Sequence, residues 1–229
     1  IQSLLGLLNF ACSVVVPGRA FLRRLIDLTK GVQFPHHFIR LNKSSKADLA
    51  LWQSFLVDFN GRSFFLNDAW HDSLSLNLYT DAAGSLGYGG IFGSEWFFGA
   101  WPDEWKQFNI TILEFYPIVL SVLLFGDKMR NQRITFFTDN AALVDIINKA
   151  TSREATVMVF VRRLVLACLN FNILFRARHV PGVKNVLAYS LSRLQVSKFR
   201  QLAPVGVQAS PTAIPIPLLP HNWPLFHLN

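Results

Sequence analysis

Three acidic residues from distant parts of the chain stand at the ends of expected secondary-structure elements. Asp81 ends an alternating, strand-like segment, and Asp139 closes a second one at residues 133–138. Glu114 falls in the first turn of an apolar helix expected at residues 111–125. Functional sites in open sheets form beyond the carboxyl ends of the strands, so these carboxylates are expected to face a common centre. Mg²⁺ takes oxygen ligands and leaves room for substrate phosphates, so the trio predicts a metal site.

Each of these acids also has a purely structural explanation. Asp is common at the ends of strands and helices, and Thr111 and Glu114 have the spacing of a capping box. A capping glutamate needs no catalytic role. The three acids together therefore carry more weight than any one of them.

The elements that would position these acids alternate between strands and helices. Residues 76–80 and 86–92 read as a hairpin, with a third strand at 95–100. Further strands are expected at 133–138 and 172–178, and helices at 111–125, 141–149, 155–169 and 185–195. The order predicts an α/β domain with a five-stranded mixed sheet, flanked by helices. A long crossover allows the first and fourth strands to pair in parallel.

Two segments of different character flank this region. Residues 1–67 are helical in pattern, with helices expected at 2–14, 19–30 and 46–59. Residues 203–229 hold no charged residue and six of the eleven prolines, which predicts an extended tail that serves as a linker or docking segment. We therefore divide the chain into a small helical N-terminal extension (1–67), an α/β domain (74–202) and the tail (203–229).

Composition narrows the class of protein. The 229 residues are 51% apolar and 16% charged, which is typical of a globular chain. Glu114, Pro117 and the Arg162–Arg163 pair interrupt the longest apolar runs, so we expect no spanning helix and no membrane partner. The chain starts on Ile without a signal-peptide pattern, so we expect a fragment of a longer, intracellular protein, cytoplasmic or nuclear. Cys12 and Cys168 are expected to be buried free thiols.

The distribution of charge suggests a polyanionic partner. Residues 1–50 hold seven Lys/Arg against two acids, and residues 151–202 hold nine against one. Residues 51–150 hold six against eleven, so an acidic centre lies between basic segments. Such basic segments bind phosphates independently of sequence, although solvated surface alone would also explain the charge. The candidate phosphate-binding residues are Arg153, Arg162, Arg163, Arg176, Arg178, Lys184 and Arg193; we expect about half of them to touch substrate.

Four motifs occur in a recognisable order. They are Tyr79-Thr80-Asp81-Ala82-Ala83-Gly84, Ile112-Leu113-Glu114, Phe137-Thr138-Asp139-Asn140-Ala141, and the segment 178–193, RHVPGVKNVLAYSLSR. Together they resemble the ribonuclease H domain of retrotransposon reverse transcriptases, of the DIRS group or the gypsy type. The likeness covers roughly residues 74–202, and residues 1–67 look like the thumb and connection that precede this domain. The paired aspartates of a polymerase palm are absent, so the chain is not a polymerase on its own.

The resemblance implies metal-dependent endonucleolytic hydrolysis of the RNA strand in an RNA–DNA hybrid. In that scheme Asp81 bridges two Mg²⁺ (or Mn²⁺) ions, and Glu114 and Asp139 complete the ion on the leaving-group side. His179 corresponds to a histidine that assists proton transfer or product release. An isolated loop histidine is equally a surface residue. The polymerase part of the same polyprotein is the implied protein partner.

The chain departs from the family at one position. The fourth carboxylate belongs at position 189, where this sequence has Tyr189. A phenol with a pKa near ~10 is neutral at pH 7 and binds Mg²⁺ poorly. Since no Asp or Glu follows residue 154, no nearby acid replaces it. We therefore expect cleavage to be weakened or lost, with one ion in place of two.

Two other interpretations remain open. Tyr189 favours a non-catalytic remnant that binds a hybrid or duplex without cutting it, whereas the intact trio favours an active nuclease. An integrase-like strand-transfer core shares the sheet and the first acids. The His-x-Pro-Gly loop at residues 179–182 and the absence of a late catalytic Glu argue against it.

Overall fold

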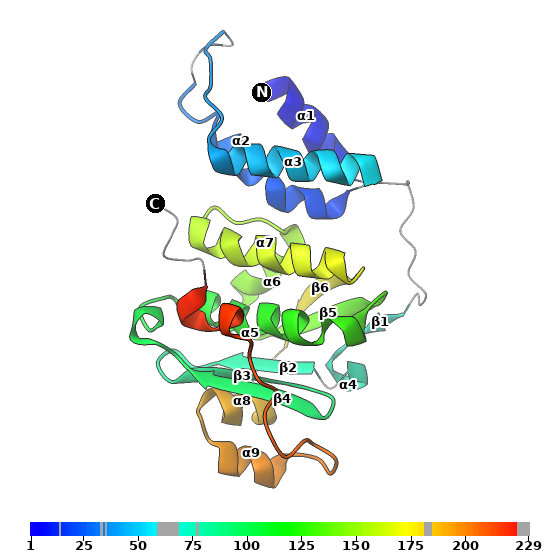
Figure 1. Cartoon of the computed structure of the whole chain (residues 1–229), viewed down its shortest axis with the longest axis vertical. Helices are drawn as coiled ribbons and strands as arrows, with labels where there is room; N and C mark the ends of the chain where they lie inside the picture. Colours follow the sequence, from blue (N-terminus) through cyan, green and yellow to red (C-terminus); the bar gives the residue numbers. More distant parts are fainter. Residues whose placement is uncertain are drawn as a thin grey trace.

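A computed structural model describes residues 1–13, 15–32, 34, 36–58, 69–76, 78–180 and 185–223 of the chain. The elements stack along the long axis in Figure 1. The N-terminal helices lie at one end, followed by the central helices, the strands and a last pair of helices at the other end. An α/β fold is confirmed.

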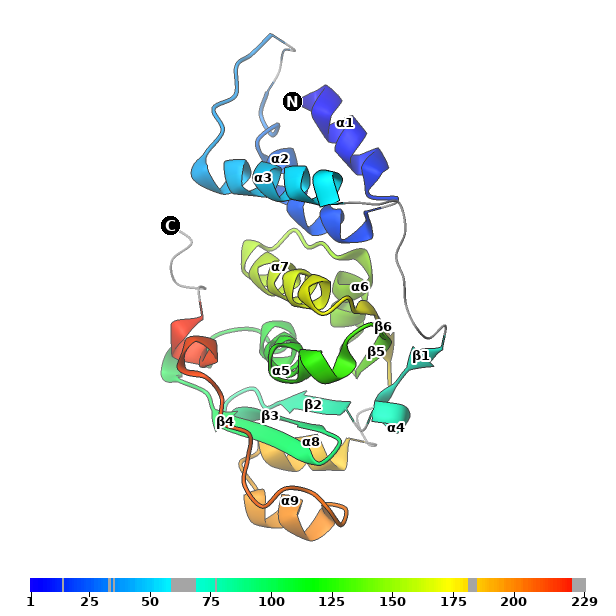
Figure 2. The same cartoon turned by 45° about the vertical axis from the view of Figure 1, so that its right-hand side comes forward.

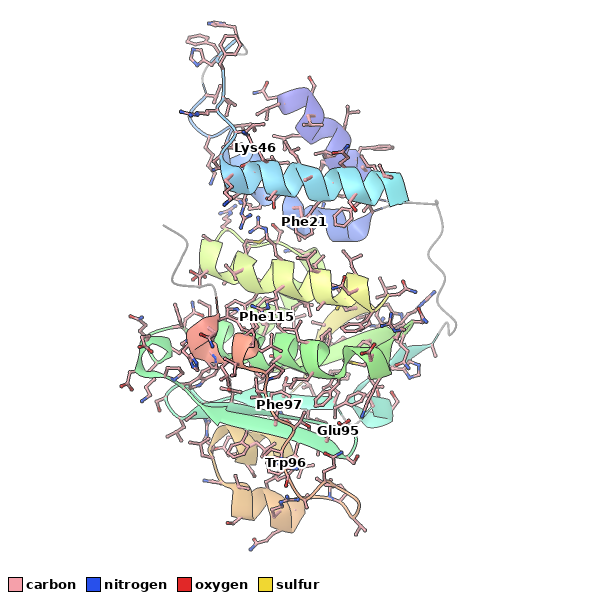
Figure 3. The ribbon with its side chains drawn as sticks, viewed as in Figure 1. Phe21, Lys46, Glu95, Trp96, Phe97 and Phe115 are labelled. Carbon is pink, nitrogen blue, oxygen red and sulfur yellow. The ribbon has the colours of Figure 1, made fainter. Side chains whose placement is uncertain are left out.

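Three consecutive strands form an antiparallel sheet. They are β2 (Leu78–Ala82), β3 (Gly87–Phe92) and β4 (Glu95–Ala100), in the order β2-β3-β4. Side chains alternate between its two faces. On β4, Phe97 packs toward Phe125 of the central helix, whereas Trp96 packs against Phe199 on the opposite side (Figure 3).

A second sheet contains parallel strands. Strand β5 (Arg133–Thr138) lies between β1 (Trp70–His71) and β6 (Leu174–His179), and it runs parallel to each. The prediction of one five-stranded mixed sheet is therefore wrong, because the described strands form two three-stranded sheets. Strand β1 takes the edge of β5 at Arg133 and Ile134, and the short helix α4 (Ser73–Leu76) then turns the chain before β2 begins. Among the described residues of β2 and β5, the expected parallel ladder does not form.

Helix α5 (Ile110–Phe125) is the central core element. Its residues from Ile112 to Val122 are buried almost without exception, and Glu114 is its only charged residue. With the 3₁₀ turn η3 (Gly126–Met129) it makes a 20-residue segment, Ile110–Met129, that is long and apolar enough to cross a membrane by length and composition. Since 67% of that segment's most apolar window is buried in the protein, it serves here as a core helix. Glu114 and Pro117 do not interrupt it as expected.

Helices α6 (Ala141–Lys149) and α7 (Ala155–Asn170) cover the parallel strands and α5. Phe115 of α5 stacks on Phe160 of α7, with ring centroids 5.6 Å apart. Asn148 of α6 pairs with the backbone of Ala177 through two hydrogen bonds of 2.8 and 2.9 Å, which fixes α6 along the outer edge of β6. Three further helices of this region are the 3₁₀ helix η2 (Asp103–Trp105), α8 (Val186–Ser192) and α9 (Val196–Leu202).

The N-terminal helices pack onto α7. They are α1 (Gln2–Ala11), the 3₁₀ helix η1 (Val16–Phe21), α2 (Arg23–Asp27) and α3 (Lys43–Asp58). The helix expected at 19–30 is thus divided between η1 and α2. Phe21 lies at the junction with α7 (Figure 3), and buried Asp48 forms ion pairs with Arg24 at 3.4 Å and with Arg162 of α7 at 3.6 Å. One continuous hydrophobic cluster includes buried residues of the N-terminal helices and of the α/β region.

The C-terminal tail docks on its own chain. It passes from α9 along β4 toward α5 in Figure 2. The amides of Gln208 and Thr212 donate to the carbonyls of Ser94 and Trp96 at 2.9 and 2.7 Å, so the tail covers the exposed edge of β4. Its described part contains two 3₁₀ turns, η5 (Ile216–Leu218) and η6 (Pro220–Asn222), where it was expected to be extended.

Trp223 attaches the described part of the tail to the core. Its side chain is 1% exposed, stacks on Phe160 with centroids 5.5 Å apart and lies edge-on to Tyr116 at 4.9 Å. The Arg163 guanidinium lies 4.0 Å above the indole ring. The tail is therefore part of the packed fold.

We expect Trp223→Ala to lower the free energy of unfolding by about 3–5 kcal/mol, because it leaves a cavity between α5 and α7. Urea denaturation followed by circular dichroism measures the change. Ile216→Ala is the matched control, since Ile216 is 72% exposed in the same tail and should change stability by less than about 0.5 kcal/mol. Equal effects of the two substitutions would mean that the tail is not docked in solution.

Candidate functional site: acidic residues around β2, α5 and β5

Strand β2 and helix α8 together position Asp81. Asp81 pairs across the sheet with Gly89 of β3, and Leu191 of α8 packs directly on that glycine. A Cβ atom at Gly89 would lie 2.3 Å from the Leu191 Cβ, so only glycine allows α8 to approach this closely. The close approach brings Ser192 to the acid, and its Oγ donates a hydrogen bond to Asp81 Oδ2.

The other end of α8 is fixed to the same strand. The Asn185 side-chain amide donates to the Thr80 carbonyl at 2.8 Å. Tyr189 follows one turn later with 43% of its surface exposed, and the Arg193 guanidinium lies 4.7 Å from its ring. The position at which the motif resemblance implies a fourth acid thus holds an aromatic ring covered by a cation.

Helix α5 presents Glu114 toward the end of β5. The helix is capped by Asn109, whose side chain accepts from the Ile112 amide at 3.1 Å, so the capping box expected at Thr111 and Glu114 is not formed. Glu114 Oε2 instead accepts a hydrogen bond from Thr138 Oγ1 at 3.4 Å. The capping explanation for this glutamate is therefore wrong.

The environment of Glu114 disfavours its negative charge. Burial raises its pKa most, and repulsion from Asp139 and Asp81 raises it further, to about 7. Hydrogen bonds from Asn140 and Thr138 oppose these effects without cancelling them. Burial also raises the pKa of Asp81, while the Ser192 hydrogen bond and the charge of Arg193 lower it and Asp139 adds repulsion. The structure thus brings the three carboxylates into one electrostatically coupled group.

Asp139 and His179 lie together at the exposed side of this group. Asp139 directly follows β5, and its side chain is exposed. His179 ends β6, in register with Thr138, and its Nε2 lies 3.1 Å from the Asp139 carbonyl oxygen. A neutral imidazole with a proton on Nε2 would donate this hydrogen bond, so the histidine is held beside the acids.

The donor set fits a hard divalent cation in chemistry and charge. Carboxylate oxygens are the ligands that Mg²⁺ prefers, and a cation would relieve the repulsion that raises the pKa of Glu114. The side chains, however, are not close enough together to form a complete ligand set. In the described part of the chain, no three Asp, Glu, His or Cys side chains are already close enough together to hold one ion. Binding would therefore require Asp81, Glu114 and Asp139 to draw closer.

The predicted phosphate-binding residues fall into different environments. Arg162 is enclosed by its ion pair with Asp48, and Arg163 is covered by Trp223. Neither is placed to meet a phosphate, and we propose no phosphate contact for either arginine. Arg153, Arg176, Arg178 and Arg193 lie at or near the surface, and Lys184 lies outside the described residues.

Sequence reasoning assigned no role to several residues that build the site. Ser192 and Gly89 determine the position of Asp81, and Thr138 and Asn140 contact the Glu114 region. Three of them lie inside the matched motifs: Thr138 and Asn140 flank Asp139, and Ser192 lies in the segment 178–193. The role of Gly89 depends on the packing of α8, which no local pattern predicts.

Comparison with known proteins adds little. No protein-family model and no curated protein sequence matches this chain. Among solved structures, the prototype foamy virus protease–reverse transcriptase (native) is similar, with a TM-score of 0.30 and 14% sequence identity. The match covers 77% of this chain and 24% of that one. At this level the similarity carries no argument about activity.

The raised pKa of Glu114 predicts a pH-dependent stability. Because its pKa is about 7 in the folded protein against 4.5 as the ordinary value, its contribution is complete below pH 4.5 and is lost as pH rises through 7. Between pH 5 and pH 8 we expect the free energy of unfolding of wild type to fall by about 2 kcal/mol relative to that of Glu114→Gln. This is less than the full pKa shift would give, because solvent screens part of it.

Urea unfolding of wild type and Glu114→Gln at pH 5 and pH 8 measures this difference. Glu104→Gln, at an exposed position, is the control and should follow wild type at each pH. If the difference in free energy of unfolding between wild type and Glu114→Gln is the same at pH 5 and pH 8, Glu114 is not buried beside the other acids.

Proposed function

We propose that the chain is a ribonuclease H-type domain derived from a retroelement reverse transcriptase, with metal-dependent cleavage of RNA in RNA–DNA hybrids as its ancestral activity. The observation that carries this proposal is the placement of Asp139 and Asp81 beside buried Glu114: burial, and then repulsion from these two acids, raises the pKa of Glu114 to about 7. Titratable groups with shifted pKa values concentrate at functional sites. The motif resemblance gives the reaction class.

Each residue has a role in this proposal. Asp81, Glu114 and Asp139 would hold Mg²⁺ or Mn²⁺, which when bound supplies charge neutralisation at the phosphate and a more acidic water. Ser192 and Thr138 orient two of the carboxylates through their hydrogen bonds. His179, held at the Asp139 carbonyl, is placed to take up or release a proton at the edge of the site.

Tyr189 weakens the proposed activity. Its phenol replaces a carboxylate, and the stacked Arg193 adds a positive charge on the α8 side of Asp81. A cation is therefore better accommodated between Glu114 and Asp139 than beside α8. We propose one retained ion and slow cleavage.

A second candidate is a binding module that holds a hybrid or duplex without cutting it. Two observations favour it: the neutral Tyr189, and the three carboxylates that do not yet form a closed ligand set among the described residues. In either case the proposed partners are an RNA–DNA hybrid and the polymerase part of the same polyprotein.

We expect Tyr189→Asp to increase cleavage of a labelled RNA–DNA hybrid in Mg²⁺ by about 10-fold or more, because it restores an oxygen ligand. Tyr189→Phe is the control and should stay at the wild-type rate. Calorimetric titration of Mg²⁺ should give one ion for wild type and two for Tyr189→Asp.

Two outcomes would contradict parts of this proposal. Rapid wild-type cleavage with no gain in Tyr189→Asp would show that position 189 is not a ligand position. If neither wild type nor Tyr189→Asp cleaves the hybrid or binds Mg²⁺, the nuclease proposal fails and only the binding module remains.

A further inference from the structure

Two arginines on β6 lie beyond the acidic site. Arg176 and Arg178 are two residues apart on one strand, so their side chains leave the same face of the sheet about 6.6 Å apart. Ala177 between them is buried on the opposite face. The arginines therefore lie on the face of the sheet away from the Ala177 side chain, and Arg178 is exposed.

Arg176 is held in a fixed orientation by two contacts. Its Nε donates to Thr135 Oγ1 of β5 at 3.0 Å, and its guanidinium carbon lies 4.0 Å above the Trp70 ring of β1. Thr135 is 3% exposed, so the acceptor is itself rigid. These contacts use the Nε donor and one face of the guanidinium, and the two terminal nitrogens remain as a planar fork.

The pair lacks compensating negative charge in its described surroundings. Over the described residues, neither arginine forms an ion pair, and Arg178 forms no hydrogen bond. Partial desolvation, followed by the positive charge of Arg178, lowers the pKa of Arg176. Like charges held side by side repel each other, and a bound anion would remove that repulsion.

The pair lies on the strand that reaches the acidic site. In the β5–β6 register, His179 pairs with Thr138 beside Asp139. Arg178 and Arg176 precede His179 on the same strand and face the opposite side of the sheet from it. Strands β1, β5 and β6 lie side by side in Figure 2. Arg178 thus directly precedes the histidine beside the acids, and Arg176 reaches across β5 to Trp70 of β1.

We propose that Arg178 and Arg176, with Trp70 and Thr135 as positioning residues, bind consecutive phosphates of a nucleic-acid strand that continues from the acidic site. This inference rests on the proposed function, because the acidic site defines where that strand enters. Nucleic acid is favoured over other polyanions because two guanidinium forks in line suit a chain of regularly spaced phosphodiesters.

Fluorescence anisotropy with a labelled RNA–DNA hybrid in EDTA tests the proposal without any contribution from cleavage. The Arg176→Ala/Arg178→Ala double variant should bind roughly 10- to 100-fold more weakly. For the double variant, the slope of log K against the logarithm of the salt concentration should become shallower by about 2, which is about 1 for each lost phosphate contact. Arg130→Ala is the matched control, because Arg130 also lies over an aromatic ring, Phe171, but is neutralised by Asp127 at 2.7 Å.

A second variant separates positioning from charge. Thr135→Val removes the hydrogen-bond acceptor of Arg176 at nearly constant volume, and we expect weaker binding with an unchanged salt slope. Arg176→Lys/Arg178→Lys should likewise keep the slope and lose part of the affinity, because the charge remains without the planar fork.

The outcomes distinguish this inference from the proposed function. Tight wild-type binding with an unchanged slope in the double alanine variant would overturn the phosphate role of Arg176 and Arg178 and leave the proposed function intact. If wild type binds neither hybrid nor duplex at low salt, the proposed function and this inference fail together. Preference for polyglutamate over nucleic acid of equal charge would overturn the choice of partner.

Discussion

Burial of a carboxylate beside two others is the constraint on which this structure depends. Glu114 is the only charged residue of α5, and the rest of that helix forms the core of the protein. Its pKa rises to about 7 because the protein excludes water from it and places Asp81 and Asp139 nearby. A buried charge beside two others lowers the free energy of unfolding, and each hydrogen bond to these carboxylates offsets part of that loss.

The surrounding fold supplies those hydrogen bonds through close packing. Gly89 lets α8 rest on the sheet, so that Ser192 reaches Asp81 from one side. From the other side, Thr138 donates to Glu114, and Asn140 links β5 to the start of α5 through Thr111. The acids are thus placed by three elements that meet only in the folded chain.

Arginines that contribute equally to the net charge have different roles in the structure. Arg162 neutralises buried Asp48 between α3 and α7, and Arg163 packs on Trp223 of the tail. Arg193 covers Tyr189, and Arg176 is fixed over Trp70. A count of basic residues by segment cannot separate these roles, because the difference lies in which acid or ring each arginine meets.

The sequence predicts local elements better than their assembly. Strands β4 and β5 and helix α6 have the expected bounds because their apolar patterns are regular and end at clear turn residues. Strand β1 has only two residues and gives no periodic signal, yet it occupies the β5 edge expected for β2. The strands therefore form two sheets because β1 pairs with β5, and no local sequence pattern predicts that pairing.

The same distinction applies to the acidic site. Motif order identified Asp81, Glu114 and Asp139, because each acid lies close to one end of a regular element. The capping interpretation of Glu114 failed because Asn109, two residues before Thr111, already caps α5. Which residue caps a helix depends on where its first turn begins, and element boundaries are the least certain part of a sequence-based prediction.

Tyr189 has consequences for charge as well as for ligands. On the α8 side, Asp81 meets the Ser192 hydroxyl and the positive charge of Arg193, while Tyr189 is neutral. On the α5 and β5 side, Glu114 and Asp139 repel each other. Negative potential is therefore concentrated between α5 and β5. Under the proposed function, loss of the fourth carboxylate moves the preferred cation position toward Glu114 and Asp139, and the α8 side of Asp81 becomes the weaker half of the site.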